Sequence, residues 1–297
     1  MRVLSLFDGL SGGQVALRNL GIHVDRYYAS EVDKYAISIT QKNFPNTIQL
    51  GDITNIGVAK PFYDKWIYDK PTGEKLHNIG DGIDLLMGGS PCQGFSSAGN
   101  GKGFDGKSKL FWEYVRVLNE TKPKYFLLEN VVMKQEWKDI ITLAMGVEPI
   151  EINSNLVSAQ NRKRLFWTNI PYRGLPVDKN ILLKDVLEDD ADPKHAISDS
   201  KIDRVLNTPR GKGFFYNKTH KKIGTIIAGY HKLPTDGTYI DLGFPRKLTP
   251  LECERLQTLP EGYTEGVSDT QRYAMIGNGW TIDVIAHILK KIRVGVD

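Results

Sequence analysis

Hydrophobic and polar positions alternate with two different periods along the first half of the chain. Apolar runs with strand character occupy residues 2–7, 25–30, 82–89, 125–131 and 148–154. Apolar positions recur at helical spacing in a segment that begins near Gly13 and in residues 33–44, 108–120 and 136–145. Strands that alternate with helices in this way predict an α/β fold, with a mainly parallel sheet and helices on both of its faces.

The alternation stops after Trp167. Pro171 and Gly174 open a stretch without clear periodicity, which is rich in glycine and basic residues and runs to about Pro245. The pattern therefore predicts a second, smaller and irregular domain, which we place at residues 173–271.

Regular structure resumes near the end of the chain. At Thr249 the sequence Thr-Pro-Leu-Glu supplies an N-cap, a proline at the first helical position and the glutamate of a capping box. A last helix is expected over residues 280–292. We expect the larger domain to consist of residues 1–172 together with 272–297.

The composition is that of a globular protein and is too polar for a membrane-spanning one, with 40% hydrophobic and 25% charged residues. The net charge of +4 permits a polyanionic partner without requiring one. Asp8 interrupts the apolar start and no signal-like stretch follows, which predicts an intracellular, cytoplasmic protein. Cys92 and Cys253 are too few for a disulfide framework or a thiolate metal site, so we expect free thiols and no metal.

A glycine-rich turn, FDGLSGG at residues 7–13, ends the first strand and opens a helix, so a ligand could approach its backbone. Glu31 ends the next strand, where a carboxylate can accept hydrogen bonds from both ribose hydroxyls, and Asp52 could meet an adenine amine. The spacing departs from the dinucleotide pattern and lacks the lysine of a P-loop, which favours a nucleoside with little phosphate. A tight turn needed only for helix packing is the alternative.

Cys92 follows an apolar strand in the sequence Gly-Gly-Ser-Pro-Cys-Gln, which places its thiol at the carboxyl end of the sheet. Residues 94–109 contain five glycines, a composition that suits a loop able to close over a substrate. Cys253 lies in an apolar-patterned helix, and there we expect a small buried hydrophobic residue.

Glu129 closes an apolar strand, and a carboxyl group removed from water holds its proton more readily, so Glu129 could donate one. A structural ion pair is the competing interpretation. Arg162 and Arg164 precede a strand-like run at alternate positions, so on a strand both would point to one face. They could form an anion or carbonyl clamp or simply a solvated charged edge.

The order of these motifs resembles that of the DNA (cytosine-5) methyltransferase family over most of the chain. The six matching segments are, in chain order, the cofactor turn at 7–13, Pro-Cys-Gln at 91–93, Glu-Asn-Val at 129–131, Gln-x-Arg-x-Arg at 160–164, RKLTPLECERLQTLP at 246–260 and Ile-Gly-Asn-Gly-Trp at 276–280. Two segments depart from the commoner forms, namely Phe-Asp-Gly in the first and Gly-Trp after Asn278 in the last. Both variants resemble a subset that includes the animal de novo enzymes and some phage-type enzymes.

The resemblance implies a Rossmann-like sheet that binds S-adenosylmethionine, and a target-recognition domain at residues 173–271 that binds duplex DNA as part of a monomer. It implies Cys92 as the nucleophile, with Glu129, Arg162 and Arg164 as the other catalytic residues. The implied cofactor contacts are Phe7, Asp8, Gly9, Leu10, Ser11, Gly12, Glu31, Val32, Asp52, Ile53, Pro91, Leu110, Asn278 and Trp280. The implied DNA contacts are Ser96, Arg210, Lys212 and Thr225. Arg210 and Lys212 lie within a stretch, residues 194–222, whose net charge is +6, and Thr225 lies just after it.

Three other interpretations are open at this point. An RNA cytosine methyltransferase would share the fold, although the Cys-Phe-Thr signature of the transfer-RNA branch is absent from the sequence. A non-catalytic DNA-binding homologue would not need Cys92, Glu129 and both arginines. A nicotinamide-dependent oxidoreductase fits the alternation but not the glycine spacing.

Overall fold

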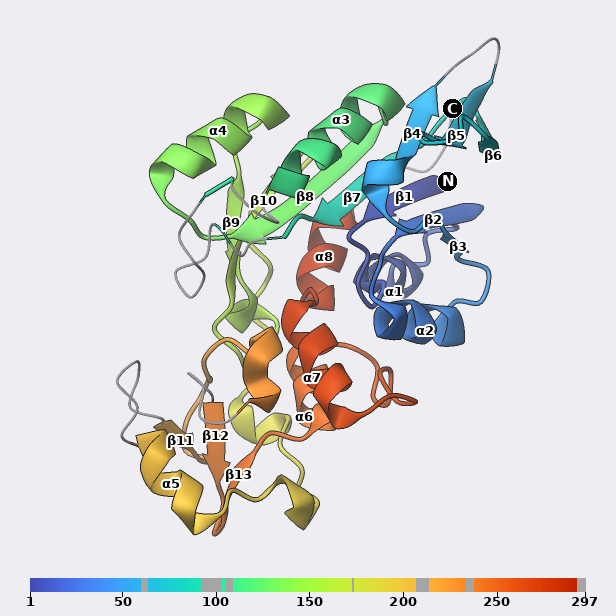
Figure 1. Cartoon of the computed structure of the whole chain (residues 1–297). Helices are drawn as coiled ribbons and strands as arrows, with labels where there is room; N and C mark the ends of the chain where they lie inside the picture. The colour runs from blue at the N-terminus through green and yellow to red at the C-terminus, as the bar shows by residue number, and fades with distance from the viewer. Residues whose placement is uncertain are drawn as a thin grey trace. The chain divides into compact units, whose positions relative to one another are not determined.

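The computed structural model describes residues 1–59, 64–91, 94, 103–104, 109–172, 174–206, 214–232 and 238–292 (Figure 1). The chain divides into two units. Unit 1 contains Met1–Ile152, Lys163–Gly174 and Ile288–Asp297, and unit 2 contains Asn153–Arg162 and Leu175–His287. No helix in the described ranges is long and apolar enough to cross a membrane.

A seven-stranded sheet forms the centre of unit 1. Its strands are β1 (Arg2–Leu6), β2 (Arg26–Ser30), β3 (Ile48–Gln49), β7 (Leu85–Gly89), β8 (Tyr125–Val131), β9 (Ile150–Asn153) and β10 (Lys163–Thr168). They lie in the order β3-β2-β1-β7-β8-β10-β9. The pairs from β3 to β8 are parallel, whereas β10 runs antiparallel to β8. The predicted mainly parallel sheet is confirmed.

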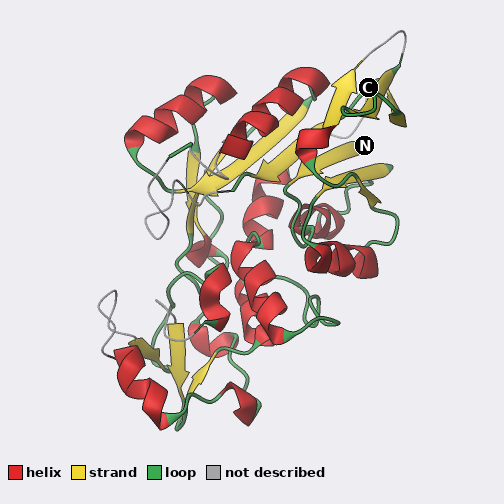
Figure 2. Ribbon diagram, viewed as in Figure 1, coloured by secondary structure: helices red, strands yellow, loops and turns green. Residues whose placement is uncertain are grey.

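Helices cover both faces of this sheet, as predicted, with α1 and α2 on one face and α3 and α4 on the other (Figures 1 and 2). Their bounds are α1 (Gly12–Asn19), α2 (Lys34–Asn43), α3 (Phe111–Thr121) and α4 (Gln135–Met145). Asp33 begins α2 because its side chain accepts hydrogen bonds from the backbone of Tyr35 and Ala36.

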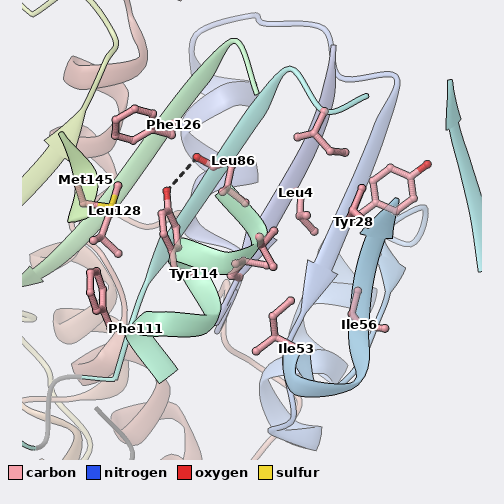
Figure 3. Close-up of a cluster of buried hydrophobic side chains, with 14 of the residues drawn as sticks. Leu4, Tyr28, Ile53, Ile56, Leu86, Phe111, Tyr114, Phe126, Leu128 and Met145 are labelled. Atoms are coloured by element: carbon pink, nitrogen blue, oxygen red, sulfur yellow. Dashed lines mark hydrogen bonds between the residues drawn. The ribbon is translucent and has the colours of Figure 1, made fainter. Parts of the chain in front are cut away.

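The core between the sheet and the second helix face follows the period-two pattern of the strands. Leu4, Leu86 and Leu128 point toward α3, where Phe111 and Tyr114 are fully buried (Figure 3). The hydroxyl group of Tyr114 is hydrogen-bonded although it is buried, because it donates to Leu86 O at 3.4 Å. The packing fixes the strands against α3 and therefore fixes the turns that follow them.

A small antiparallel sheet between β3 and β7 was not predicted from the sequence. It consists of β4 (Ile56–Ala59), β5 (Lys65–Asp69) and β6 (Lys75–Gly80) in that order. Its inward residues Ile67 and Ile79 are buried, whereas the ring of Tyr68 lies across Gly57, where any Cβ would come within 2.4 Å of it. These three strands are short and only one face of each is apolar, so the alternation of hydrophobic and polar residues predicts them only weakly.

Unit 2 is built from short elements. Its helices are α5 (Asp199–Leu206), α6 (Pro250–Leu256), α7 (Asp269–Asn278) and α8 (Ile282–Leu289), the last of which ends in unit 1. Its sheet has the order β11 (Phe214–Tyr216), β12 (Thr238–Asp241), β13 (Pro245–Lys247). Short turns of 3-10 helix lie at Ile53–Asn55 in unit 1 and at Ser154–Leu156, Leu183–Asp185, Pro193–His195 and Ala228–His231 in unit 2.

The predicted helix start at Thr249 is confirmed in detail. Thr249 Oγ1 accepts from Glu252 N at 3.1 Å and Thr249 N donates to Glu252 Oε2 at 2.8 Å. Glu252 also forms a fully buried ion pair with Arg246, at 2.7 Å. Cys253 on the same helix is buried, and burial raises the pKa of its thiol, as expected for a small structural hydrophobic residue.

Candidate active site

The turns that carry the sequence motifs of unit 1 meet at one edge of the large sheet. In the parallel register Leu6 lies beside both Ser30 and Gly88, and Gly89 lies beside Glu129. The carboxyl ends of β1, β2, β7 and β8 therefore lie side by side, which is where open α/β sheets bind their ligands.

The cofactor turn after β1 has an unusual backbone. Phe7, Gly9 and Ser11 all have positive φ, at 56°, 57° and 60°. For a residue other than glycine this conformation costs about 1–2 kcal/mol, and such strain concentrates at ligand-binding sites. Ser11 is buried at the start of α1, and its amide closes the turn by donating to Asp8 O at 3.0 Å.

Glu31 links this turn to the end of β2. Its Oε2 accepts from Gly9 N at 2.7 Å, and its Oε1 accepts from Val32 N and Asp33 N, both at 2.8 Å. A carboxylate has about four acceptor positions, so three amides orient it and leave room for a ligand hydroxyl. Val32 beside it is 70% exposed, an apolar side chain open to a ligand.

Asp52 follows β3, and the segment after it is bound to α3. Its Oδ1 accepts from Thr54 N at 2.9 Å. Arg116 Nη2 donates to Ile53 O at 3.0 Å and to Ile56 O at 2.8 Å, which fastens the segment after Asp52 to the helix. Leu110 is the residue that caps the start of α3. The role of Arg116 was not predicted from the sequence, because a charged residue at this position of a helix pattern looks like any residue on the solvent-exposed face.

Asp8 turns its carboxyl group into the protein. Tyr27 donates its hydroxyl to Asp8 Oδ1 at 2.8 Å, whereas Asp8 Oδ2 is buried without a hydrogen-bond partner among the described residues. Burial raises the pKa of Asp8 from 3.8 to about 6, although the hydroxyls of neighbouring residues lower it. Tyr27 was not recognised from the sequence because it reads as an ordinary inward strand residue.

The segment that leads to Cys92 is fixed beside β8. Asn130 Nδ2 donates to Ser90 Oγ at 3.0 Å and to Ser90 O at 3.3 Å. Gly88 is required here because a Cβ would lie 2.6 Å from Leu6 O. Pro91 is described, while the predicted site residues Cys92, Ser96, Arg210 and Lys212 lie outside the described residues.

Glu129 and Arg164 form an ion pair at this edge. Arg164 Nε lies 3.0 Å from Glu129 Oε1, and the two side chains are 17% and 12% exposed. The N–H is not aligned for a hydrogen bond, so the contact is electrostatic. The structural ion pair considered from the sequence is present, and it lies beside the segment that leads to Cys92.

Arg162 does not share the position of Arg164, contrary to the prediction that one strand carries both. β10 begins at Lys163, so strand alternation does not extend to Arg162. Arg162 is 3% exposed and its guanidinium donates to Ile226 O at 2.9 Å, Gly277 O at 3.0 Å and Gly279 O at 2.8 Å. It joins two distant segments of unit 2.

The other residues predicted for unit 2 are sequence neighbours of the residues whose carbonyls Arg162 binds. Thr225 donates its hydroxyl to Asn161 O at 2.6 Å. Asn278 is the exposed last residue of α7, and Trp280 follows two residues later. Gln257, which was not predicted from the sequence, donates to Ile276 O at 2.9 Å and so helps to hold the same turn.

The chain matches one family by sequence. Residues 1–142 and 178–294 match the C-5 cytosine-specific DNA methylase family. The chain belongs to this family. As a C-5 cytosine-specific DNA methylase it is an enzyme that acts on DNA, and its segments at residues 7–13 and 129–131 lie at the edge of the sheet described above.

Curated relatives of this DNA methylase are bacterial type II methyltransferases. M1.ScrFI of Lactococcus lactis subsp. cremoris is 32% identical over 98% of the chain and 77% of its own length. M.NlaX of Neisseria lactamica is 30% identical over 99% and 97%. M.HhaI of Haemophilus parahaemolyticus is 28% identical over 98% and 94%.

Solved structures share the fold at lower identity. The Entamoeba histolytica methyltransferase EhMeth superposes with a TM-score of 0.73 at 17% identity, covering 98% of this chain and 97% of that one. The Dnmt2 methyltransferase of S. pombe superposes with a TM-score of 0.71 at 19% identity, covering 97% of both chains. In the described part of this DNA methylase, no group of three or more His, Cys, Asp or Glu side chains could hold a metal ion.

Proposed function

We propose that this DNA methylase transfers a methyl group from S-adenosylmethionine to carbon 5 of cytosine in duplex DNA, with Cys92 as a covalent nucleophile. One observation carries the proposal. Ser90, two residues before Cys92, is hydrogen-bonded to Asn130, and the adjacent Glu129 is paired with Arg164. The segment that precedes Cys92, the Glu129 carboxyl and the Arg164 guanidinium therefore belong to neighbouring strand ends.

The residues at the sheet edge fit the cofactor. The turn of residues 7–12 offers a strained backbone, Glu31 is oriented for hydroxyl groups, and Asp52 follows the third strand. S-adenosylmethionine, when bound there, supplies an electrophilic methyl group on a sulfonium centre. We propose further cofactor contacts from Val32, Ile53, Pro91, Leu110, Asn278 and Trp280.

Carbon 5 of cytosine is a poor nucleophile, so the ring needs activation before it can accept a methyl group. The Cys92 thiolate adds to carbon 6, and the electron pair of the 5,6 double bond becomes available at carbon 5. Glu129 protonates or hydrogen-bonds ring nitrogen 3, which offsets the charge that develops during addition. After methylation a base removes the proton from carbon 5, and elimination breaks the bond to Cys92.

The two arginines take separate parts in this scheme. Arg164, paired with Glu129, binds the ring carbonyl and favours the thiolate form of Cys92 by its charge. Arg162 uses its guanidinium on backbone carbonyls, so we assign it a supporting role.

A stacked cytosine cannot reach a thiol, so the base must rotate out of the duplex at a cost of a few kcal/mol. We propose that Ser96, Arg210, Lys212 and Thr225 contact the DNA, and that basic residues in 194–222 bind its phosphates. We propose that the enzyme acts as a monomer in the bacterial cytoplasm, where it has direct access to DNA.

The decisive experiment uses duplex DNA with cytosine or 5-fluorocytosine at the target positions, with labelled S-adenosylmethionine. Methyl transfer to cytosine and a stable protein–DNA adduct on 5-fluorocytosine are expected, because fluorine blocks the final proton loss. Cys92→Ala should lose both while still binding DNA. No transfer to varied DNA, together with transfer to transfer RNA assayed in parallel, would instead support an RNA substrate.

A further inference from the structure

Asp8 is a buried carboxyl group whose two oxygens have unequal surroundings. Oδ1 accepts one hydrogen bond, from Tyr27 on β2, whereas Oδ2 is buried without a hydrogen-bond partner among the described residues. An ionised carboxylate needs several donors to offset the loss of water, and this site supplies too few. The neutral acid is therefore stabilised in the free protein.

The groups that face Asp8 come from each element packed around it. Burial is the largest influence and raises the pKa of Asp8 from 3.8 to about 6, and the negative charge of Glu31 acts in the same direction. The hydroxyls of Ser5 on β1, Tyr27 on β2 and Ser11 at the start of α1 act in the opposite direction. Burial also raises the pKa of Tyr27 well above its usual range, so Tyr27 remains a hydrogen-bond donor.

Asp8 and Glu31 flank the same peptide group of the cofactor turn. Gly9 N, which directly follows Asp8, donates to Glu31 Oε2 at 2.7 Å. A ligand whose ribose bound Glu31 would therefore lie next to the turn that contains Asp8, and the charge of Glu31 itself already acts on Asp8. S-adenosylmethionine carries a sulfonium charge, whereas the product S-adenosylhomocysteine has a neutral sulfur. A nearby positive charge favours the ionised form of a carboxyl group.

We propose that Asp8 is a proton-release site coupled to the cofactor: in mildly acidic solution it holds a proton in the free protein and gives it up to solvent when a ligand with a positive charge at the sulfonium position binds. The ionised Asp8 then attracts the charged methyl donor more strongly than the neutral product. The inference rests on the proposed function, because it takes S-adenosylmethionine as the ligand of this turn.

The test is calorimetric titration of the whole protein in pairs of buffers with different ionisation enthalpies, which counts the protons released on binding. S-adenosylmethionine and sinefungin, which has an amine at the sulfonium position, should release a fraction of a proton near pH 6. The release should fall away by about pH 8, where Asp8 is already ionised in the free protein. S-adenosylhomocysteine should release less at the same pH.

Asp8→Asn is the matched variant, because the amide keeps the shape of the neutral acid and cannot lose a proton. It should bind the ligands and show no difference in proton release between charged and neutral ones. Tyr27→Phe keeps the carboxyl but removes its hydroxyl donor, so the pH of maximal release should move upward. This second variant decides the matter should Asp8→Asn fail to fold.

Equal proton release with S-adenosylmethionine and S-adenosylhomocysteine would overturn the inference, as would unchanged release in Asp8→Asn. Failure of the unaltered protein to bind any of the three ligands would contradict the proposed function itself. Ligand binding with a proton release that does not depend on Asp8 would contradict only the role proposed for Asp8.

Discussion

Arg164 Nε lies 3.0 Å from Glu129 Oε1, and this ion pair joins two strands that run in opposite directions. The antiparallel register sets Arg164 beside Val131, so the start of β10 meets the end of β8. Arg162, only two residues earlier, binds three backbone carbonyls in unit 2. Two arginines of one motif therefore have different neighbours, and their substitutions should have different effects.

Arg164→Ala should slow methyl transfer by about 10²–10³-fold, the usual loss when one preorganised charge is removed from a reacting group. Arg164 is partly exposed at the sheet edge, so thermal stability should change little. Single-turnover transfer to DNA, together with the melting temperature, measures both effects. A large drop in melting temperature would mean that Arg164 is a structural residue. Arg164→Lys serves as the control that keeps the charge.

Arg162→Ala should instead destabilise the protein, by about 3 kcal/mol or more, because three backbone carbonyls lose their donor in a buried place. Arg162→Lys should recover part of this loss, since one ammonium group can reach fewer carbonyls than a guanidinium. Urea unfolding of the three proteins measures the difference. A stable Arg162→Ala protein that transfers methyl groups slowly would contradict the supporting role and favour contact with the base.

The sheet edge could be predicted from the sequence because each of its turns follows a strand with a strong apolar signal. β1, β7 and β8 consist almost entirely of buried residues, and β8 has the bounds expected from the pattern. Parallel strands place their carboxyl ends together, so the positions of Glu31, Asp52 and Glu129 at one edge followed from their order in the chain.

Other features depend on contacts that one-dimensional patterns do not show. The register that brings Arg164 to Glu129 is a long-range pairing, and the carbonyls bound by Arg162 lie more than sixty residues along the chain. Asp8 reads as a polar turn residue, and its burial becomes visible only when Tyr27 is placed beside it. Periodicity indicates which side chains are inside, but it does not identify their partners.

Gly277→Ala should strongly destabilise unit 2. A Cβ at Gly277 would lie 2.3 Å from the carbonyl carbon of Ile227 and 2.4 Å from Ala228 N, and backbone atoms cannot move aside as a side chain would. Gly229→Ala is the matched control, because its Cβ would meet only Ile227 Cδ1, at 4.0 Å. Melting temperatures of the two variants test the comparison. Equal melting temperatures would show that the α7 segment is not packed on residues 227–228.

Asp8→Asn should stabilise the protein without any ligand, and increasingly so as the pH rises. The pKa of Asp8 is about 6 in the folded protein, whereas its ordinary value, which applies to the unfolded chain, is 3.8. Between these two pH values the folded protein holds a proton on Asp8 that the unfolded chain has lost. The free energy of unfolding therefore falls between about pH 4 and pH 6 and then levels off. A shift of about two pKa units at ~1.4 kcal/mol each gives ~3 kcal/mol above pH 6.

Asparagine stays neutral, so the stability of Asp8→Asn relative to the unaltered protein should grow over this range, and urea unfolding at several pH values measures it. The other titrating groups cancel in the difference between the two proteins. A difference that does not vary with pH would show that Asp8 titrates alike in the folded and unfolded chain.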